Sequence, residues 1–215
     1  FPGMIVLPHS HDVALLPPLA PTLLQAVSFF FVLSGFILTY VYPRLETWEA
    51  RGRFLLARFA RVWPAHLASF ALLLLLLHRL NQLELKNWGE GAVVGVVNLS
   101  MLQSWFISPK YFFSFNGVSW SISTEFAFYL FFPFLIHRWN RTWWWKMALA
   151  LGCALGLIAL AVHLQLPDYL PSRPRQEPII SGLVYVNPLA RVFEFTLGMF
   201  TAMVWKKLEP RLRLD

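Results

Sequence analysis

The sequence has little charge and almost no cysteine. Only 13% of its 215 residues are charged, about half the share of an ordinary soluble domain, and 57% are hydrophobic. A water-soluble fold of this size could not bury so much apolar surface, and intrinsically disordered chains are poor in such residues. The single cysteine, Cys153, excludes an internal disulfide framework, a cysteine-based metal site and a dithiol redox motif. The composition therefore predicts an integral membrane protein.

The sequence also lacks the common signatures of soluble enzymes. It contains no Gly-rich phosphate loop, no zinc-binding signature and no GxSxG nucleophile elbow. In the segment His9-Ser10-His11-Asp12, the adjacent His11 and Asp12 do not share a helix face, so their adjacency does not indicate a His–Asp dyad. His9 and His11 lack the i, i+4 spacing of a helical metal site. No metal is expected.

Long apolar stretches are what the sequence does contain. Each of a series of segments approaches the roughly 20 mostly apolar residues that a membrane helix requires. These segments are Thr22–Tyr42, Phe54–Leu77, Gly91–Ile107, Val118–Ile136, Met147–Leu166 and Pro188–Trp205. The polar, proline-rich stretch Pro167–Pro188 is expected to be an ordered or semi-ordered loop. We therefore expect an all-α, polytopic transmembrane helix bundle that forms a single domain over residues 1–215.

The basic residues orient these segments, because cytoplasmic loops are enriched in Lys and Arg. The loop and helix start after the first complete span hold Arg44, Arg51, Arg53, Arg58 and Arg61, which assigns that side to the cytoplasm. If every segment crosses, 8 Lys/Arg lie inside against 9 outside. If Gly91–Ile107 does not cross fully, the split becomes 12 to 5. The charge distribution therefore favours a re-entrant or interfacial Gly91–Ile107 and does not indicate nucleic-acid binding.

Ionisable residues inside apolar helices are costly, so each requires an explanation. Arg58 and Arg61 are three residues apart and share a helix face; they either anchor the helix at the interface or clamp an anionic group such as phosphate. Glu125 lies one turn after Ser121 and one turn before Tyr129 on a polar strip. There it either forms a structural salt bridge with Arg191 or an arginine elsewhere, or serves chemistry.

The last ionisable pair inside an apolar segment is Arg191 and Glu194. These residues are at i, i+3 and either satisfy one another or face a substrate.

Four motifs in order resemble the acyltransferase-3 family of multispanning membrane O-acyltransferases. That family includes bacterial enzymes that acylate surface polysaccharides, lipo-oligosaccharides and some secondary metabolites. The motifs are FFFVLSGFILT (Phe29–Thr39), FLLARFARVWP (Phe54–Pro64), NGVSWSISTEFAFYLFFP (Asn116–Pro133) and NPLARVFEFTLGM (Asn187–Met199). They extend over nearly the whole chain.

The resemblance also implies a truncated chain. In the family the first helix carries an Arg, ten intervening residues and then a His, and counting back from His11 ends one position before Phe1. This favours His11 over His9 as the family histidine. The chain is then expected to run from the end of helix 1 to about helix 7, the N-terminal two-thirds of a family member.

The resemblance implies transfer of an acyl group, commonly acetyl, from cytoplasmic acyl-CoA to a hydroxyl of a carbohydrate or another surface or secreted acceptor. Acyl-CoA would be a co-substrate, with no bound cofactor, and the location would be a bacterial inner or plasma membrane. His11 would be the general base, Glu125 would orient it or the acceptor, and Arg58 and Arg61 would hold the CoA phosphates. The candidate pocket residues are Asn116, Ser119, Trp120, Tyr129, Arg191 and Glu194.

Two other classes remain open on the residues alone. A transporter or a translocase of a lipid-linked saccharide would use Glu125, Arg191 and Glu194 to line a substrate path and would need no acyl-CoA. A non-catalytic membrane partner protein would use the same residues only for packing.

Overall fold

The computed structural model describes residues 19–79, 88–167 and 177–212, and within these ranges all regular structure is helical. The predicted all-α fold is confirmed. The elements are α2 (Leu19–Val41), α3 (Trp48–Arg79), α4 (Trp88–Leu99), η3 (Gln103–Trp105), α5 (Pro109–Phe112), α6 (Trp120–Ile136), α7 (Trp139–His163), η4 (Gly182–Val186) and α8 (Pro188–Leu212).

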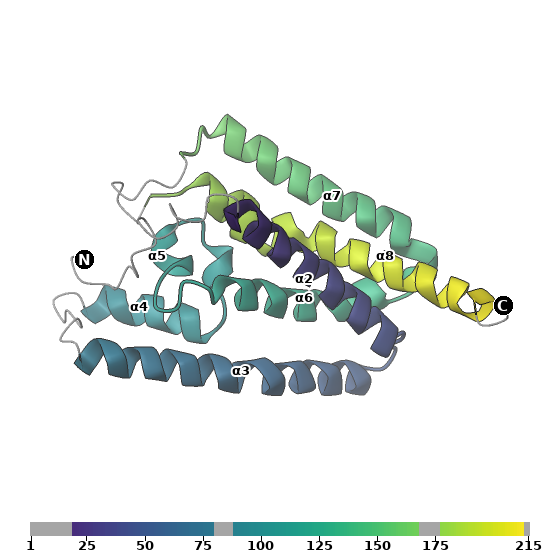
Figure 1. Ribbon diagram of the computed structural model, residues 1–215, viewed down its shortest axis with the longest axis horizontal. Coiled ribbons are helices and arrows are strands. Elements are labelled where there is room, and N and C mark those ends of the chain that lie inside the picture. The colour runs from purple at the N-terminus through teal and green to yellow at the C-terminus, as the bar shows by residue number, and fades with distance from the viewer. Residues whose placement is uncertain (1–18, 80–87, 168–176, 213–215) are drawn as a thin grey trace.

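The long helices form one bundle, with α3 and α7 along its two edges in the view of Figure 1. Helix α8 packs against α2, α6 and α7, and α6 packs against α3. Helices α2, α6 and α8 end at the same end of the bundle where α3 and α7 begin (Figure 1). Arg44, Arg51, Arg138, Arg141 and Lys207 lie at this end, which we call the basic end. The positive-inside rule assigns it to the cytoplasm.

Two glycines allow α2 and α8 to pack closely. A Cβ on Gly35 would lie 2.0 Å from the carbonyl oxygen of Phe195, and one on Gly198 would lie 1.9 Å from that of Val32. Membrane helices associate through such small-residue contacts, since lipid supplies no hydrophobic drive between helices. The backbone of α2 is therefore held directly against α8.

Helix α4 does not cross the bundle. Its 12 residues span about 18 Å, whereas the hydrocarbon core is about 30 Å thick. After α4 the chain turns at Met101, whose φ of 54° is left-handed. It then continues through η3 and α5 at the same end of the bundle as the start of α6 (Figure 1). Gly91–Ile107 therefore does not run from one end of the bundle to the other, in agreement with the charge distribution, which favoured a re-entrant or interfacial segment.

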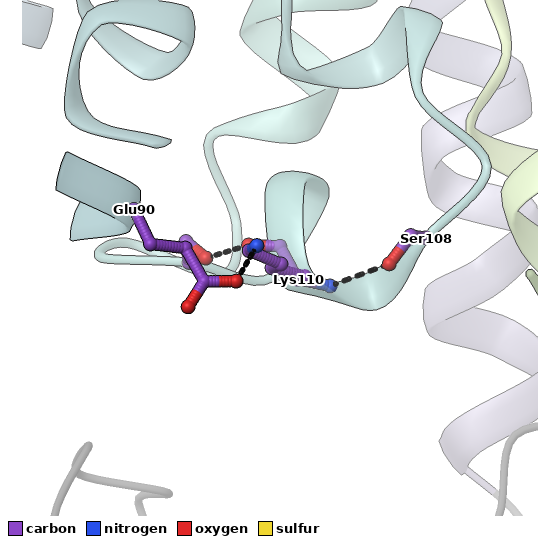
Figure 2. Close-up of polar contacts among 4 residues, drawn as sticks. Glu90, Ser108 and Lys110 are labelled. Atoms are coloured by element: carbon purple, nitrogen blue, oxygen red, sulfur yellow. Dashed lines mark hydrogen bonds and ion pairs between the residues drawn. The ribbon is translucent and has the colours of Figure 1, made fainter. Parts of the chain in front are cut away.

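Polar contacts hold the re-entrant segment in place. Figure 2 shows the Lys110 ammonium of α5 paired with the Glu90 carboxylate of α4, while the Ser108 hydroxyl accepts from the backbone N–H of Lys110. Deeper in the bundle, a ring nitrogen of His66 on α3 lies 2.9 Å from the carbonyl oxygen of Asn98 at the end of α4. The segment is therefore tied to α3 as well as to α5.

The surface of the bundle is apolar. Helices α3 and α7 are long and apolar enough to cross a membrane, and only 17% of the most apolar window of each is buried within the structure. A core helix of a soluble protein would be mostly buried. Exposed side chains such as Leu72 on α3 and Leu155 on α7 are thus placed to contact lipid.

Lysines satisfy the carbonyl groups at two helix ends. The Lys146 ammonium donates to the carbonyl oxygens of Phe134, Leu135 and His137 at the C-terminal end of α6, at 3.2, 2.9 and 2.7 Å. Lys206 does the same for the end of α2, at 2.8 Å from the Tyr40 carbonyl oxygen. Cations at helix C-termini complement the helix dipole.

The stretch Pro167–Pro188, expected to be a loop, is partly helical. Residues 182–186 form η4, a π-helical turn. The Thr124 hydroxyl of α6 donates to the carbonyl oxygen of Val186 at 2.9 Å, and both residues are buried. Interior packing on α6 therefore orders the end of this stretch, which its proline content did not indicate.

Candidate active site

A pocket of about 320 Å³ lies between α2, α3 and α6. Its polar lining consists of Ser34 from α2, Arg58 and Arg61 from α3, and Glu125 and Tyr129 from α6. Its apolar lining consists of Phe30, Leu33, Ile37, Leu38 and Val62. Three segments far apart in the sequence therefore bring two guanidinium groups and one carboxylate to a single apolar-walled pocket.

Glu125 is held by two hydroxyl groups. The Tyr129 hydroxyl donates to Glu125 Oε1 at 2.5 Å, and the Ser34 hydroxyl from α2 lies 3.3 Å from the same oxygen. Within the described part of the chain no cation lies within ion-pairing distance of this carboxylate. The predicted polar strip is present at Tyr129, but the Ser121 hydroxyl donates instead to the carbonyl oxygen of Val118, in the turn before α6. The salt-bridge alternative for Glu125 to Arg191 is wrong, because Arg191 pairs with Glu194.

Arg58 is fixed by aromatic side chains. Its Nη2 donates to the Tyr42 hydroxyl at 2.9 Å. Its Cζ lies 5.1 Å from the Tyr42 ring centroid, 5.7 Å from that of Phe54 and 6.0 Å from that of Tyr129, all within cation–π range. Its Nε is buried and has no hydrogen-bond partner among the residues that the structure describes. A buried guanidinium donor without an acceptor costs free energy. A bound ligand that supplied the acceptor would remove this cost.

Arg61 is more exposed than Arg58, and it makes no hydrogen bond or ion pair with any residue that the structure describes. The i, i+3 spacing brings both arginines to the pocket, as predicted. Helix α3 has 32 residues and so spans about 48 Å, roughly 18 Å more than the hydrocarbon core. Because Glu49, Arg51 and Arg53 occupy its start, the excess length lies at the basic end. The two arginines then sit near the membrane boundary on that side.

Arg191 and Glu194 form an ion pair on α8, with Arg191 Nη1 3.0 Å from Glu194 Oε1. Arg191 Nη2 also donates to the Ser28 hydroxyl of α2 at 2.8 Å, and its Cζ lies 4.8 Å from the Tyr185 ring centroid. Neither residue lines the pocket. The two residues therefore pair with one another, which was the first of the two alternatives, and Arg191 also links α8 to α2. Arg191 Nε and Glu194 Oε2 are nevertheless buried without partners.

Asn116, Ser119 and Trp120 lie at the start of α6 and not in the pocket lining. The Ser119 hydroxyl donates to the Asn116 carbonyl oxygen at 2.7 Å and accepts from Gln103 Nε2 at 3.2 Å. Trp120 packs on Tyr185 with ring centroids 5.0 Å apart. These contacts join α6 to η3 and η4. As pocket residues the three stay a prediction.

Sequence reasoning did not single out Ser34 or Tyr42. Ser34 lies in the first motif, FFFVLSGFILT, where a hydroxyl group in an apolar helix could have indicated a polar contact with another helix. Tyr42 precedes Pro43, and a residue before proline commonly ends a helix. The position of Tyr42 at the end of α2 could therefore have been predicted. The contact of Tyr42 with Arg58 could not be predicted from the sequence, because it depends on how α2 and α3 lie in the fold.

His11, the predicted general base, and His9 lie outside the described residues, so their positions relative to the pocket stay predictions. Over the described ranges no three His, Cys, Asp or Glu side chains are grouped to hold a metal ion. The pocket chemistry that can be described is therefore that of two arginines, one glutamate and two hydroxyl groups.

Comparison with known proteins identifies the family. A family model described as an acyltransferase domain, that of the acyltransferase-3 family, matches residues 4–215. The chain belongs to the acyltransferase-3 family. This family is membrane-spanning and its members transfer acyl groups other than aminoacyl groups, so the apolar surface of α3 and α7 faces lipid and the bundle is a transmembrane one.

Curated relatives agree with this assignment. Acyltransferase MdmB of Streptomyces mycarofaciens is 33% identical over 83% of this chain and 46% of its own length. Nodulation protein 10 of Rhizobium leguminosarum bv. viciae is 27% identical over 85% of this chain and 49% of its own length. Peptidoglycan O-acetyltransferase OatA of Listeria monocytogenes is 30% identical over 86% of this chain and 30% of its own length. The chain thus spans half or less of these acyltransferase-3 relatives. No solved structure matches.

Proposed function

We propose that the protein is a membrane O-acyltransferase that moves an acyl group, acetyl in the simplest case, from cytoplasmic acyl-CoA to a hydroxyl of a carbohydrate or another surface or secreted acceptor. The observation that carries the proposal is the pocket between α2, α3 and α6, where Arg58, Arg61 and Glu125 meet. Family membership supplies the reaction class, and the pocket supplies a place for an anionic donor. We further propose a bacterial inner or plasma membrane location.

In the proposed donor site, Arg58 and Arg61 hold phosphate groups of CoA. Guanidinium groups present planar forks of donors that match phosphate oxygens. The buried and unpartnered Nε of Arg58 and the free guanidinium of Arg61 supply those donors. The apolar wall of Leu33, Ile37 and Val62 suits the thioester arm and the acyl group. Acyl-CoA acts as a co-substrate, and the reaction needs no other cofactor.

In the proposed reaction, a neutral His11 imidazole accepts the proton of the acceptor hydroxyl as the oxygen attacks the thioester carbonyl carbon. The new C–O ester bond forms, the C–S bond breaks, and the CoA sulfur leaves and takes up the proton. An unperturbed histidine has a pKa near working pH, which suits this role. Glu125, held by Tyr129 and Ser34, orients the imidazole or the acceptor.

The carbohydrate acceptor is proposed from the chemistry of one relative, whose name describes O-acetylation of peptidoglycan. Because Arg58 and Arg61 lie near the basic end, the donor would bind from that side and the acceptor would approach from the opposite side. A second relative is named only as an acyltransferase.

Membranes that carry the protein and are supplied with acetyl-CoA labelled in the acetyl group test the proposal. We expect label in a hydroxyl-bearing acceptor, released by mild alkali as expected of an ester. His11→Ala should abolish the label while the protein remains in the membrane. His9→Ala is the matched control and should retain transfer. Transport of a saccharide with no use of acyl-CoA would contradict the proposal and support the translocase alternative.

A further inference from the structure

We propose that Tyr42 is a positioning residue for the acyl donor, because it fixes the Arg58 guanidinium in the orientation that binds phosphate. This inference rests on the proposed function, in which Arg58 binds acyl-CoA. Tyr42 does not line the pocket; it contacts the arginine from the side. Its hydroxyl accepts from Arg58 Nη2 at 2.9 Å, and its ring lies 5.1 Å from the Arg58 Cζ.

The structure holds Tyr42 itself in place. Its backbone N–H still donates to the Leu38 carbonyl oxygen at 2.8 Å, so it continues the last turn of α2. Pro43 follows, and a residue before proline is restricted to extended conformations, which ends the helix there. The Tyr42 ring meets Phe54 edge-on with centroids 5.1 Å apart, and Phe54 packs against Phe132 at 5.2 Å. The acceptor for Arg58 is therefore attached to the buried core.

The two pocket arginines differ because of this contact. Arg58 is confined by the hydroxyl and rings described above, whereas Arg61 is exposed and makes no hydrogen bond or ion pair with the described residues. An arginine has five N–H donors in a fixed fork. The described contacts of Arg58 use one of them, and its buried Nε has no partner. Holding Nη2 at Tyr42 leaves the other donors available and fixes the plane in which they lie.

Such preorganisation strengthens binding, because a long side chain that is already ordered loses less conformational entropy when its ligand arrives. Arg58 then acts as the fixed member of the donor site and Arg61 as the adjustable one. The same geometry explains why lysine would be a poor substitute at position 58, since an ammonium cannot bind Tyr42 and present a planar fork to phosphate at once.

Tyr42→Phe tests the inference, because it removes the hydroxyl and keeps the ring against Phe54 and Arg58. We expect the KM for acyl-CoA to rise about two- to tenfold, the size of a typical net hydrogen-bond contribution, with kcat unchanged. Tyr40→Phe is the matched control. Tyr40 lies two residues earlier, its ring stacks on Phe36 at 6.1 Å and faces Lys206, and its loss of a hydroxyl should leave both constants unchanged.

A double-mutant cycle separates positioning from a general structural effect. In an Arg58→Ala background, Tyr42→Phe should have no further effect on the KM for acyl-CoA, since the group that Tyr42 positions is gone. Independent, multiplying effects would overturn the inference. If Arg58→Ala raises the KM but Tyr42→Phe alone does not, the donor site stands and the positioning role fails. If Arg58→Ala itself leaves the KM unchanged, the proposed donor site fails and this inference fails with it.

Discussion

Substitution of Gly198 by alanine should separate α8 from α2 and disturb the pocket. A Cβ at this position would lie 1.9 Å from the Val32 carbonyl oxygen and 2.9 Å from the Phe36 backbone nitrogen. Real Cβ atoms essentially never approach other heavy atoms within 3.0 Å, so the two backbones must part by roughly 1 Å. A radial gap of that size forfeits about a quarter to a half of the dispersion energy of the contacting atoms.

The expected cost follows from two opposing terms. Overpacking of a close contact destabilises by about 1–3 kcal/mol, whereas replacing glycine by alanine in a helix interior stabilises by about 0.5–1 kcal/mol. The difference of these ranges is a net loss of about 0–2.5 kcal/mol, and the clash with backbone atoms, which cannot move aside as a flexible side chain would, places Gly198 in the upper half of that range. Gly152→Ala on α7 is the matched control, because a Cβ there meets nothing within 4 Å. It should be neutral or slightly stabilising.

Thermal unfolding of the purified protein in detergent, followed by tryptophan fluorescence, measures this difference. Gly198→Ala should unfold below the wild type and Gly152→Ala at or above it. Because Ser34 adjoins Gly35 on the displaced helix, Gly198→Ala should also raise the KM for acyl-CoA at temperatures where it stays folded. Equal unfolding temperatures for the two variants would refute the close α2–α8 packing on which this reasoning depends.

Two further substitutions test other parts of the account. Glu125→Gln keeps an oxygen that can accept from Tyr129 and Ser34 and removes only the charge, so kcat for acyl transfer should fall by at least about tenfold with no change in unfolding temperature; unchanged kcat would remove Glu125 from the reaction. Lys146→Met removes the donor to three carbonyl oxygens at the C-terminal end of α6 and should lower the free energy of unfolding by about 2–3 kcal/mol, with partial recovery in Lys146→Arg. A stability equal to wild type would contradict the capping role.

The sequence was sufficient to predict the long helices because most of their apolar stretches are bounded by charge or proline. The stretch Val118–Ile136 was predicted and α6 occupies Trp120–Ile136; Pro188 was predicted to begin the last span and begins α8. The helix ends differ where polar residues extend a helix beyond the membrane. Helix α3 starts at Trp48, six residues before the predicted Phe54, because hydropathy reports the lipid boundary and not the end of the backbone hydrogen bonds.

The pocket was predictable only in part. Spacing along the sequence predicts which residues share a helix face, and it correctly paired Arg58 with Arg61 and Glu125 with Tyr129. Contacts between helices depend on rotation and depth, which spacing does not set, so the hydroxyl of Ser34 on Glu125 and that of Tyr42 on Arg58 were missed. The pairing of Arg191 with Glu194 was one of the readings that the i, i+3 spacing left open, and the structure contains it.

The central claim is that the pocket between α2, α3 and α6 binds the acyl donor through its two arginines. Equilibrium binding of CoA to the purified protein in lipid nanodiscs tests it most directly, with Arg58→Ala/Arg61→Ala against wild type and Arg53→Ala as a control whose side chain pairs with Glu49 outside the pocket. A charge-assisted hydrogen bond contributes about 2 kcal/mol, so the double variant should bind CoA at least about 30-fold more weakly, while Arg53→Ala binds as wild type does. Equal affinity in the double variant and the wild type would contradict the account.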